Sequence, residues 1–465
     1  MTTKSFSRRS FLKGSTAAAL ATLLPRGPLS AAGFAPIGRL KPAAGPIIAD
    51  HTVVDQYADI PQAYLDLIKE MWISVPGESH SYAYRRGCEL LQDADSRFQV
   101  NVLEDGTPEA YTDQHLRMSR ATWGDVDNAS GWHYGYGEED WYTSDTAIQR
   151  TKAHLTYCHA HGPALAAMGF GWCWDMTWQN DPGGTTDPVH QVQWAGSSEG
   201  GPDGSLRWGL DAGDETLTGN SVCMDTYLGA TQQYIDHCQA NGYLTKVFFT
   251  TGPVDGGGNT DENGYQRHLK HEHLRNYVKA NDSRILFDYA DILCWSNAGD
   301  QQTTEWTDHG GTPRTYQVIH DDNMLDLDGS YNEDGDHIGE RGALRLAKAL
   351  WWMLARLAGW DGTPANALIL RGSSSDQTVR LSWELNTTLP GTATWRITYT
   401  GSTGTPPSPI DDIPLATRAY PVTGLTNYTP HTFTLSAIDG GSAVLTQTIQ
   451  ATPTDRLVYL PLILR

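Results

Sequence analysis

The alternation of short apolar runs with longer helical patterns across residues 47–361 constrains the fold more than any other feature of the sequence. The expected strands cover residues 71–75, 98–103, 165–172, 244–250, 285–294 and 316–320. The expected helices cover about residues 81–94, 144–160, 224–240, 262–280 and 338–358. Apolar strands that alternate with helices are typical of a mostly parallel sheet with helices on both faces. We therefore expect a three-layer α/β/α domain, with functional loops beyond the carboxyl ends of its strands.

The composition changes at residue 362, after which the chain is rich in Thr and Ser. Segments such as 379–383 and 394–399 alternate apolar and polar residues with the period of a β-strand. The run 424–433 resembles the tyrosine-corner region of fibronectin type III domains, which implies a C-terminal β-sandwich over residues 362–455. Its expected core residues are Trp383, Leu425 and Tyr428. Residues 456–465 form an apolar tail, either a signal for attachment to a polymer or cell surface or a last strand.

The N-terminus carries a targeting pattern. It reads Ser7-Arg8-Arg9-Ser10-Phe11-Leu12-Lys13, followed by a mildly apolar run and by small residues near position 32. This pattern resembles a twin-arginine signal peptide, which implies a leader at residues 1–32, a linker at residues 33–46 and export from the cytoplasm. The apolar run is too short for a membrane anchor, and no later stretch is long and apolar enough. We expect an extracytoplasmic protein, secreted or at the cell surface, without a transmembrane anchor.

The formal charge of the chain is −21, and the first 32 residues contain no acidic residue, so the exported part is more acidic still. An acidic body repels polyphosphate, which argues against a nucleic-acid partner and against anionic membrane surfaces. The six cysteines all precede residue 300, and their spacing does not choose between disulfides and buried free thiols.

The first of the expected strands is followed by Pro76-Gly77-Glu78-Ser79-His80-Ser81, directly before a helical pattern. A serine at such a strand-to-helix turn places its hydroxyl at the carboxyl edge of the sheet. The helix that follows points the positive end of its dipole toward any oxyanion formed there. Two interpretations of Ser79 are open at this point: a catalytic nucleophile, or an ordinary N-cap of the helix.

A second block, Asp334-Gly335-Asp336-His337, precedes the last long helix, with Gly342 and Ala347 further on. A carboxylate three residues before a histidine can orient its imidazole. This block resembles the last conserved block of SGNH (GDSL-like) hydrolases, and Gly77-Glu78-Ser79 resembles the Gly-Asp-Ser block of that family, with Glu in place of Asp. The resemblance covers residues 47–360. It implies an SGNH/flavodoxin-like fold and a catalytic triad of Ser79, His337 and Asp334.

Between these two blocks the resemblance weakens. The family places a glycine after its second strand, for which Gly124 is the candidate, and an asparagine after its third strand. Here the third expected strand runs into Gly169-Phe170-Gly171-Trp172-Cys173-Trp174-Asp175, without an asparagine. Asn180 and Asn259 are the candidates for the missing donor to the oxyanion hole.

Eight of the 16 tryptophans lie between Trp123 and Trp208, in segments rich in Gly, Asp and Thr. Those that stand among turn-forming residues are Trp132, Trp141, Trp178, Trp194 and Trp208. They are either exposed indoles, suited to stacking on sugar rings or aromatic acyl groups, or buried indoles that anchor large loops. We assign Trp123, Trp174 and Trp178 to substrate binding.

Two patterns could be mistaken for metal sites. The spacing of His268, His271 and His273 does not place all three on one helix face, and a solvated helix surface is the better interpretation. The run 326–332 echoes an EF-hand calcium loop, but Tyr331 occupies the position that needs glycine. We therefore expect no metal and no cofactor.

The sequence favours an exported serine esterase or deacylase that removes acyl groups from a carbohydrate or a related ester. One alternative is a non-catalytic surface protein that binds carbohydrate on the same scaffold. The other is a glycoside hydrolase or lyase, for which Glu138, Glu139 and Asp175 are available but share no diagnostic spacing. The acyl group and the polymer are left open by the sequence.

Overall fold

The computed structural model describes residues 46–77, 79–104, 111–120, 123–124, 132–133, 143–174, 185–196, 207–256, 261–331, 337–364, 367–400 and 404–455. The expected leader 1–32, all of the linker except residue 46, and the tail 456–465 lie outside these residues.

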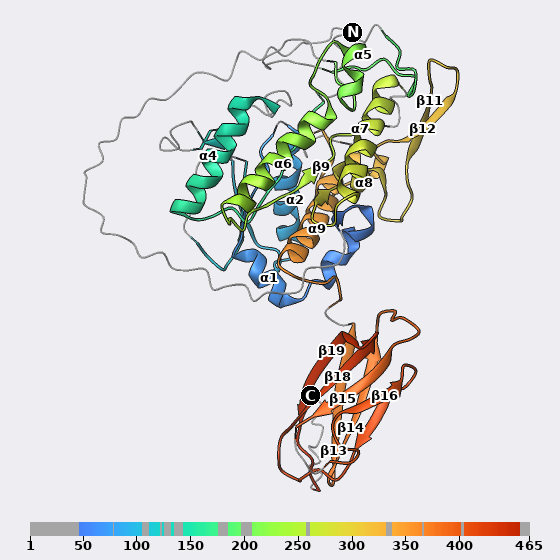
Figure 1. Ribbon diagram of the computed structural model, residues 1–465. Helices are drawn as coiled ribbons and strands as arrows, with labels where there is room; N and C mark the ends of the chain where they lie inside the picture. The colour runs from blue at the N-terminus through green and yellow to red at the C-terminus, as the bar shows by residue number, and fades with distance from the viewer. Residues whose placement is uncertain are drawn as a thin grey trace, which may run out of the picture. The chain divides into compact units, whose positions relative to one another are not determined.

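A parallel sheet forms the centre of the part of the chain that ends with helix α9 (Glu340–Leu357) (Figure 1). Five strands lie in the order β3-β4-β2-β7-β8, and three more lie in the order β1-β10-β9. Residues 246–250 supply β8 to the first set and β9 to the second, so the two sets adjoin through one segment. Their bounds are β1 Ile47–Ala49, β2 Trp72–Ser74, β3 Val100–Leu103, β4 Leu116–Ser119, β7 Ala167–Met168, β8 Lys246–Val247, β9 Phe249–Thr250 and β10 Ile285–Phe287. The predicted α/β class with a parallel sheet is confirmed.

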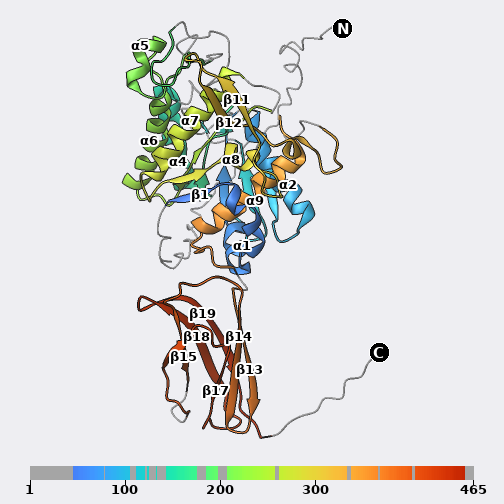
Figure 2. The ribbon, with the colours of Figure 1, turned by 90° about the vertical axis from the view of Figure 1, so that its right-hand side faces the viewer.

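Helices lie on both faces of this sheet, as Figure 2 shows. One face carries α1 (Gln62–Lys69), α2 (His80–Ala94) and α9 (Glu340–Leu357), and the other carries α4 (Asp145–His161), α6 (Met224–Ala240) and α7 (Glu262–Lys279). Successive strand residues alternate between the two cores: Ile73 packs in the first, and Trp72 packs in the second. This alternation follows from the two-residue period of a β-strand. The five predicted helices are confirmed to within about two residues at each end.

Two expected strands are wrong in part. The apolar run 285–294 is a strand only to Phe287, and α8 (Tyr289–Cys294) follows because the Asp288 carboxylate accepts a hydrogen bond from the Asp291 N–H and caps the helix. A continuous apolar run does not by itself distinguish a strand from a buried helix. The other expected strand, 316–320, overlaps β12 (Pro313–Gln317). Strand β12 pairs antiparallel with β11 (Thr303–Thr307) in a hairpin that is separate from the parallel sheet.

The remaining short elements connect the sheet to its helices. They are the 3₁₀ helices η1 (His51–Asp59), η3 (Ala212–Asp214) and η4 (Asp321–Met324), helix α5 (Glu215–Thr218), and the antiparallel pair β5 (Trp123–Gly124) and β6 (Trp132–His133). All six cysteines are free thiols, and five of them are buried.

Helices α2 and α9 pack in close contact. A Cβ atom added to Gly87 of α2 would lie 2.0 Å from the carbonyl oxygen of Ala343 on α9, so no larger residue fits between them. At the edge of this contact, Arg86 and Glu340 form an ion pair of 2.7 Å. Each helix begins near the carboxyl edge of the sheet, and this packing therefore brings their N-terminal ends together.

Residues 367–455 form two antiparallel sheets with a core of their own. One has the order β13-β14-β17 and the other β16-β15-β18-β19. Their bounds are β13 Leu368–Ser375, β14 Thr378–Leu385, β15 Thr394–Tyr399, β16 Ile410–Pro414, β17 Ala419–Val422, β18 His431–Asp439 and β19 Ser442–Ala451. Trp383 and Leu425 are buried as expected, but Tyr428 is 56% exposed. Its backbone has a φ of +62°, and its hydroxyl bonds the exposed Asp455 carboxylate outside the core, so the core role expected for Tyr428 is wrong.

Candidate functional site

Ser79 lies where the strand order reverses. Strand β2 sits between β4 and β7; the chain passes from β2 to β3 and β4 on one side, and later to β7 and β8 on the other. In an open parallel sheet the connections leave the two central strands in opposite directions at such a point, and a crevice forms at their carboxyl ends. Ser79 follows β2 at this edge and occupies the N-cap position of α2.

The turn before Ser79 depends on glycine. Gly77 has a φ of +138°, a conformation that disfavours side chains, and a Cβ there would lie 2.1 Å from the carbonyl oxygen of Gly171. The Gly171 N–H donates to the Pro76 carbonyl at 2.8 Å, which extends the pairing of β2 and β7 beyond the named strands. The two loops that leave β2 and β7 are thereby held in direct contact.

Arg85 fixes the same turn from within α2. Its buried guanidinium donates to the carbonyls of Val75 at 3.0 Å and Ser81 at 2.9 Å, and it pairs with Glu104 at 2.5 Å. Charge-assisted hydrogen bonds of this kind are stronger than neutral ones, so they fix the main chain at Val75 and at Ser81. The position of Ser79 therefore follows from buried contacts on both sides of it.

The Ser79 hydroxyl is not used to cap α2. The residue has helical dihedral angles, and its side chain makes no capping hydrogen bond. Instead, Oγ lies 2.9 Å from Nε2 of His337, a residue 258 positions away in the sequence. The geometry therefore disfavours the N-cap interpretation of this serine. Asp334, the third member of the expected triad, lies outside the described residues.

His337 is exposed and stands three residues before α9. Its backbone has a φ of +64°, which is uncommon for a residue with a side chain. The start of α9 is anchored nearby: the Gly339 N–H donates to the Asn323 carbonyl at 2.9 Å, and the Glu340 N–H donates to the Asp326 carboxylate at 3.1 Å. These bonds hold the imidazole at the N-terminal end of α9, which packs against α2.

Three further side chains, Cys173, His80 and Trp174, lie around this pair. Of these, only Trp174 was a candidate for the site from the sequence. Cys173 Sγ is 3.7 Å from Ser79 Oγ, in the loop that follows β7. The ring of His80 contacts both His337 and Trp174, with centroid separations of 4.8 and 5.0 Å. His80 follows Ser79 directly, and Cys173 lies in the segment where an asparagine was sought, so both could have been nominated by position alone.

Of the other nominated site residues, two lie in a described strand. Trp123 and Gly124 form β5, which pairs with β6. Six further nominees lie outside the described residues: Trp178, Asn180, Asn259, Glu138, Glu139 and Asp175. The donors that complete an oxyanion hole are thus still a prediction.

Two of the loop tryptophans are buried, so they are not the exposed indoles that one interpretation required. Trp194 and Trp208 are almost fully inaccessible to solvent. Trp194 donates from Nε1 to the Asp187 carboxylate at 3.0 Å, and Trp208 packs on Tyr227 at a centroid distance of 4.4 Å. These indoles anchor the loops around them. Trp194 and Trp208 therefore fit the second interpretation, in which buried indoles anchor large loops.

The residues with metal-like spacing make other contacts. His271 is buried and accepts a hydrogen bond from the Gly252 N–H at 3.1 Å, so the expected solvated helix surface is wrong for this residue. Burial lowers its pKa well below 6.5. In the EF-hand-like run, Asp326 caps α9, and the Asp328 carboxylate accepts from the N–H and hydroxyl of Ser330.

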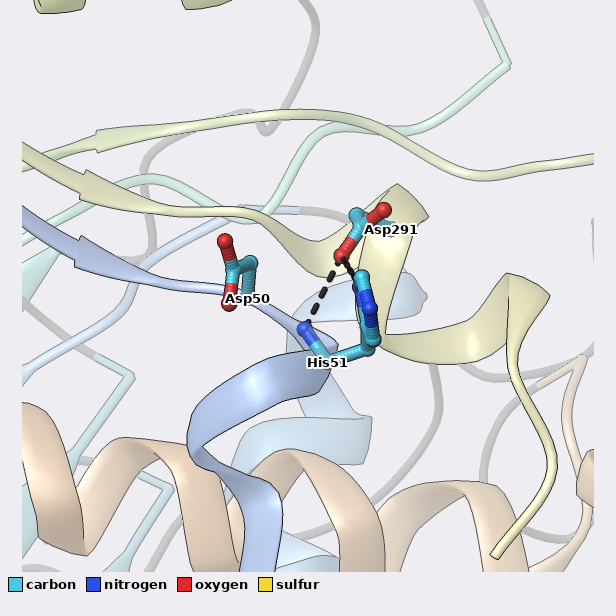
Figure 3. A group of neighbouring side chains, drawn as sticks. All are labelled: Asp50, His51 and Asp291. Carbon is cyan, nitrogen blue, oxygen red and sulfur yellow. Dashed lines mark hydrogen bonds and ion pairs between the residues drawn. The ribbon is translucent and has the colours of Figure 1, made fainter. Parts of the chain in front are cut away.

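Within the described residues, one group of side chains has metal-compatible spacing: Asp50, His51 and Asp291, where β1 and β10 end (Figure 3). His51 Nδ1 lies 2.5 Å from Asp291 Oδ2, and its ring stacks on Trp295 at 3.9 Å. Asp50 caps η1 by accepting from Thr52. Burial and the nearby Asp288 carboxylate raise the pKa of Asp291. These contacts join β1, η1 and α8 to each other.

Comparison with known proteins bears on the N-terminus. The sequence model of the TAT (twin-arginine translocation) pathway signal sequence matches residues 5–25. The predicted signal is confirmed, and the chain is exported by the twin-arginine route. No curated protein matches the chain. Among the helices of the described residues, none has the length and apolar character needed to cross a membrane.

Proposed function

We propose that this protein is an exported serine hydrolase of the SGNH type that cleaves acyl esters. The observation that carries the proposal is the 2.9 Å separation between Ser79 Oγ and His337 Nε2 at the reversal of strand order. His337 Nε2 takes the hydroxyl proton as Ser79 Oγ attacks the ester carbonyl, and it returns that proton to the departing alcohol. Water then attacks the acyl carbon of the acyl-serine while His337 Nε2 takes a proton from the water. That proton passes to Ser79 Oγ as the bond between Oγ and the acyl group breaks and the acid is released.

The location of Ser79 supports the stabilisation of an oxyanion. Its side chain lies at the N-terminus of a 15-residue helix, α2, where the positive end of the helix dipole is directed. Negative charge that develops on the carbonyl oxygen during attack is favoured there. By resemblance, Asp334 orients the second nitrogen of His337, and Gly124 with Asn180 or Asn259 supplies additional donors.

The resemblance to SGNH hydrolases gains support from topology. The two terminal blocks of that family imply a parallel sheet with helices on both faces, a serine after the central strand and a histidine before the last long helix. This chain has each of these features. The loop after β7 departs from the family pattern, because residues 169–175 contain no asparagine where the family has Gly-x-Asn-Asp.

The C-terminal sheets support a fibronectin type III-like sandwich. Three strands in the order β13-β14-β17 face four in the order β16-β15-β18-β19, and both sheets contribute to one core with Trp383 and Trp395 in contact. Such modules space or attach domains rather than catalyse reactions. We assign this part of the chain to attachment at a polymer or cell surface.

We propose a carbohydrate ester, or an ester with an aromatic acyl group, as the substrate. Among the indoles nominated for substrate binding, Trp174 has a described side chain, which contacts the ring of His80, the residue after Ser79. It offers a surface for a sugar ring or an aromatic acyl group. The alternative of a non-catalytic binding protein needed many exposed indoles, and the burial of Trp194 and Trp208 removes part of that support.

The test compares two serines at helix N-termini. Ser79→Ala should lower the kcat for p-nitrophenyl acetate by about 1,000-fold or more, with little loss of stability, because Ser79 makes no capping bond. Ser144 caps α4 through its side chain, so Ser144→Ala should keep full activity and lose about 1 kcal/mol of stability. Hydrolysis by Ser79→Ala at the wild-type rate would overturn the proposal.

A further inference from the structure

His80 is a buried imidazole with an unusual environment. Its side chain is 2% exposed, and Nδ1 has no hydrogen-bond partner within the described residues. Because this nitrogen makes no hydrogen bond there, packing against neighbouring side chains holds the ring in place.

Three aromatic side chains from separate elements surround the His80 ring. The His337 ring lies 4.8 Å away with an angle of 36° between the planes, and Trp174 meets His80 edge-on at 5.0 Å and 83°. Tyr289 of α8 lies 6.3 Å away, also edge-on. The ring of His80 is therefore held between the loop after β7, helix α8 and the segment before α9.

Trp174 is itself held from α7. The Arg267 guanidinium lies 4.6 Å from the Trp174 ring centroid, within the range of a cation–π contact. Arg267 is buried and forms an ion pair with Asp255, in the loop that follows β9. A continuous set of contacts thus runs from Asp255 through Arg267, Trp174 and His80 to His337.

His337 needs such support more than a buried residue would. It is exposed, and it stands in a left-handed backbone conformation before the first turn of α9. An exposed side chain samples several rotamers, and each departure from the 2.9 Å contact with Ser79 removes the base from its substrate proton. A rigid ring packed beside the imidazole limits those departures.

We propose that His80 is a positioning residue that holds the His337 imidazole against Ser79, and that Trp174 and Arg267 hold His80 in place. The proposal rests on the hydrolase function proposed above. His80 acts through its ring, which touches His337, and takes no part in proton transfer.

The charge state of His80 suits this role. Burial, followed by the neighbouring His337 and Arg267, lowers the pKa of His80 well below 6.5, so its ring is neutral at neutral pH. A neutral ring does not repel the imidazolium that forms when His337 takes the Ser79 proton. A second protonated histidine at the same position would oppose that step.

The experiment uses variants of the exported chain to distinguish a role of the His80 ring from a role of its nitrogens. His80→Leu keeps an apolar side chain of similar size without a ring and should lower kcat for p-nitrophenyl acetate about tenfold at unchanged KM. His80→Phe keeps the ring and should retain at least about a third of wild-type kcat. His154 is an equally buried histidine on α4, and His154→Leu should leave kcat unchanged.

Trp174→Leu provides a second test that leaves the core of α2 intact. A fall in kcat of several fold at unchanged KM supports the positioning role, whereas a rise in KM alone shows that Trp174 only binds substrate and overturns its part in the proposal. Equal losses in His80→Leu and His80→Phe, or no loss in either, would overturn the role of the His80 ring.

The variants also distinguish a failure of this proposal from a failure of the hydrolase proposal on which it rests. If Ser79→Ala keeps wild-type hydrolysis, the hydrolase assignment fails whatever the His80 variants do. If Ser79→Ala is inactive and His337→Ala retains activity while His80→Leu does not, His80 is itself the base and the positioning role is wrong. Thermal unfolding of each variant shows whether a loss of kcat accompanies a loss of folding.

Discussion

Helices α7 and α9 are both 18 residues long, and they lie on opposite faces of the same sheet, but they are buried by different means. Helix α9 buries an apolar face that includes Leu346, Leu350 and Trp351. The buried residues of α7 include four basic side chains, Arg267, Lys270, His271 and Arg275. Burial of an apolar face is non-directional, whereas each buried cation needs a particular partner in a particular place.

The buried polar side chains of α7 bind loop residues at the carboxyl edge of the sheet, where the candidate site lies. Gln266 exchanges hydrogen bonds with the main chain of residues 193 and 195, at 2.6 and 2.8 Å, and Lys270 Nζ donates to the Ala195 carbonyl at 3.0 Å. Arg275 binds the Asp288 carboxylate through two nitrogens, at 2.6 and 2.8 Å. A polar buried face thus fixes irregular segments that have no strand or helix of their own to satisfy their main-chain groups.

Both helices serve the candidate site, in different ways. Helix α9 places His337 by packing closely on α2, and α7 supports Trp174 through Arg267. We expect the apolar helix to tolerate conservative substitutions and the polar helix to depend on intact pairs. Three predictions test that contrast, from the largest expected effect to the smallest.

The largest effect is expected at Arg275. Burial opposes its charge, but the Asp288 carboxylate raises its pKa above the ordinary value, so the pair is ionised. Arg275→Met leaves Asp288 buried without its partner and should cost about 3–5 kcal/mol, measured by urea denaturation of the exported chain. The double variant Arg275→Met/Asp288→Asn should recover at least half of that loss. A double variant no more stable than Arg275→Met would show that the pair is not what stabilises α7.

An intermediate effect is expected on α9. Leu350 is fully buried in the core shared with α2, and Leu350→Ala should cost about 3 kcal/mol through lost apolar contact and a residual cavity. Leu350→Met, which conserves volume, should cost less than about 1.5 kcal/mol. Urea denaturation measures the loss of stability in both variants. A loss for Leu350→Met as large as that for Leu350→Ala would contradict the contrast between α9 and α7.

The smallest effect concerns pH. Burial, with Arg275 as a second cause, holds the pKa of His271 well below 6.5, while in the unfolded chain it ionises near 6.5. The unfolded state therefore binds the additional proton, so stability is complete above about pH 6.5 and falls as pH drops below it, by at most about 1.4 kcal/mol per pH unit for this residue. His271→Gln should have a shallower loss of stability between pH 6.5 and 5 than the wild type. Equal slopes would show that His271 is protonated in the folded state.

Much of the α/β domain could be predicted because helical and strand periods are local properties. The boundaries of α2, α4, α6 and α7 follow the apolar pattern closely, although α7 is weakly amphipathic. The export signal was equally local, and residues 5–25 match it. The assignment of Ser79 and His337 to one site rested on a resemblance, and their separation of 2.9 Å comes from the packing of α2 on α9.

What only the tertiary structure decided concerns groups whose partners lie far away in the sequence. The polar sequence of α7 predicted a solvated surface, yet His271 and Arg275 are buried because Gly252 and Asp288 meet them there. Trp208 stands among turn residues but packs on Tyr227, while Tyr428, expected in a core, turns outward at a positive φ. A local pattern shows how often apolar residues recur along the chain. It does not show which distant group will form a hydrogen bond or ion pair with a buried polar atom. For that reason the sequence determined the layers and the leader of this protein, and tertiary packing determined which side chains surround Ser79.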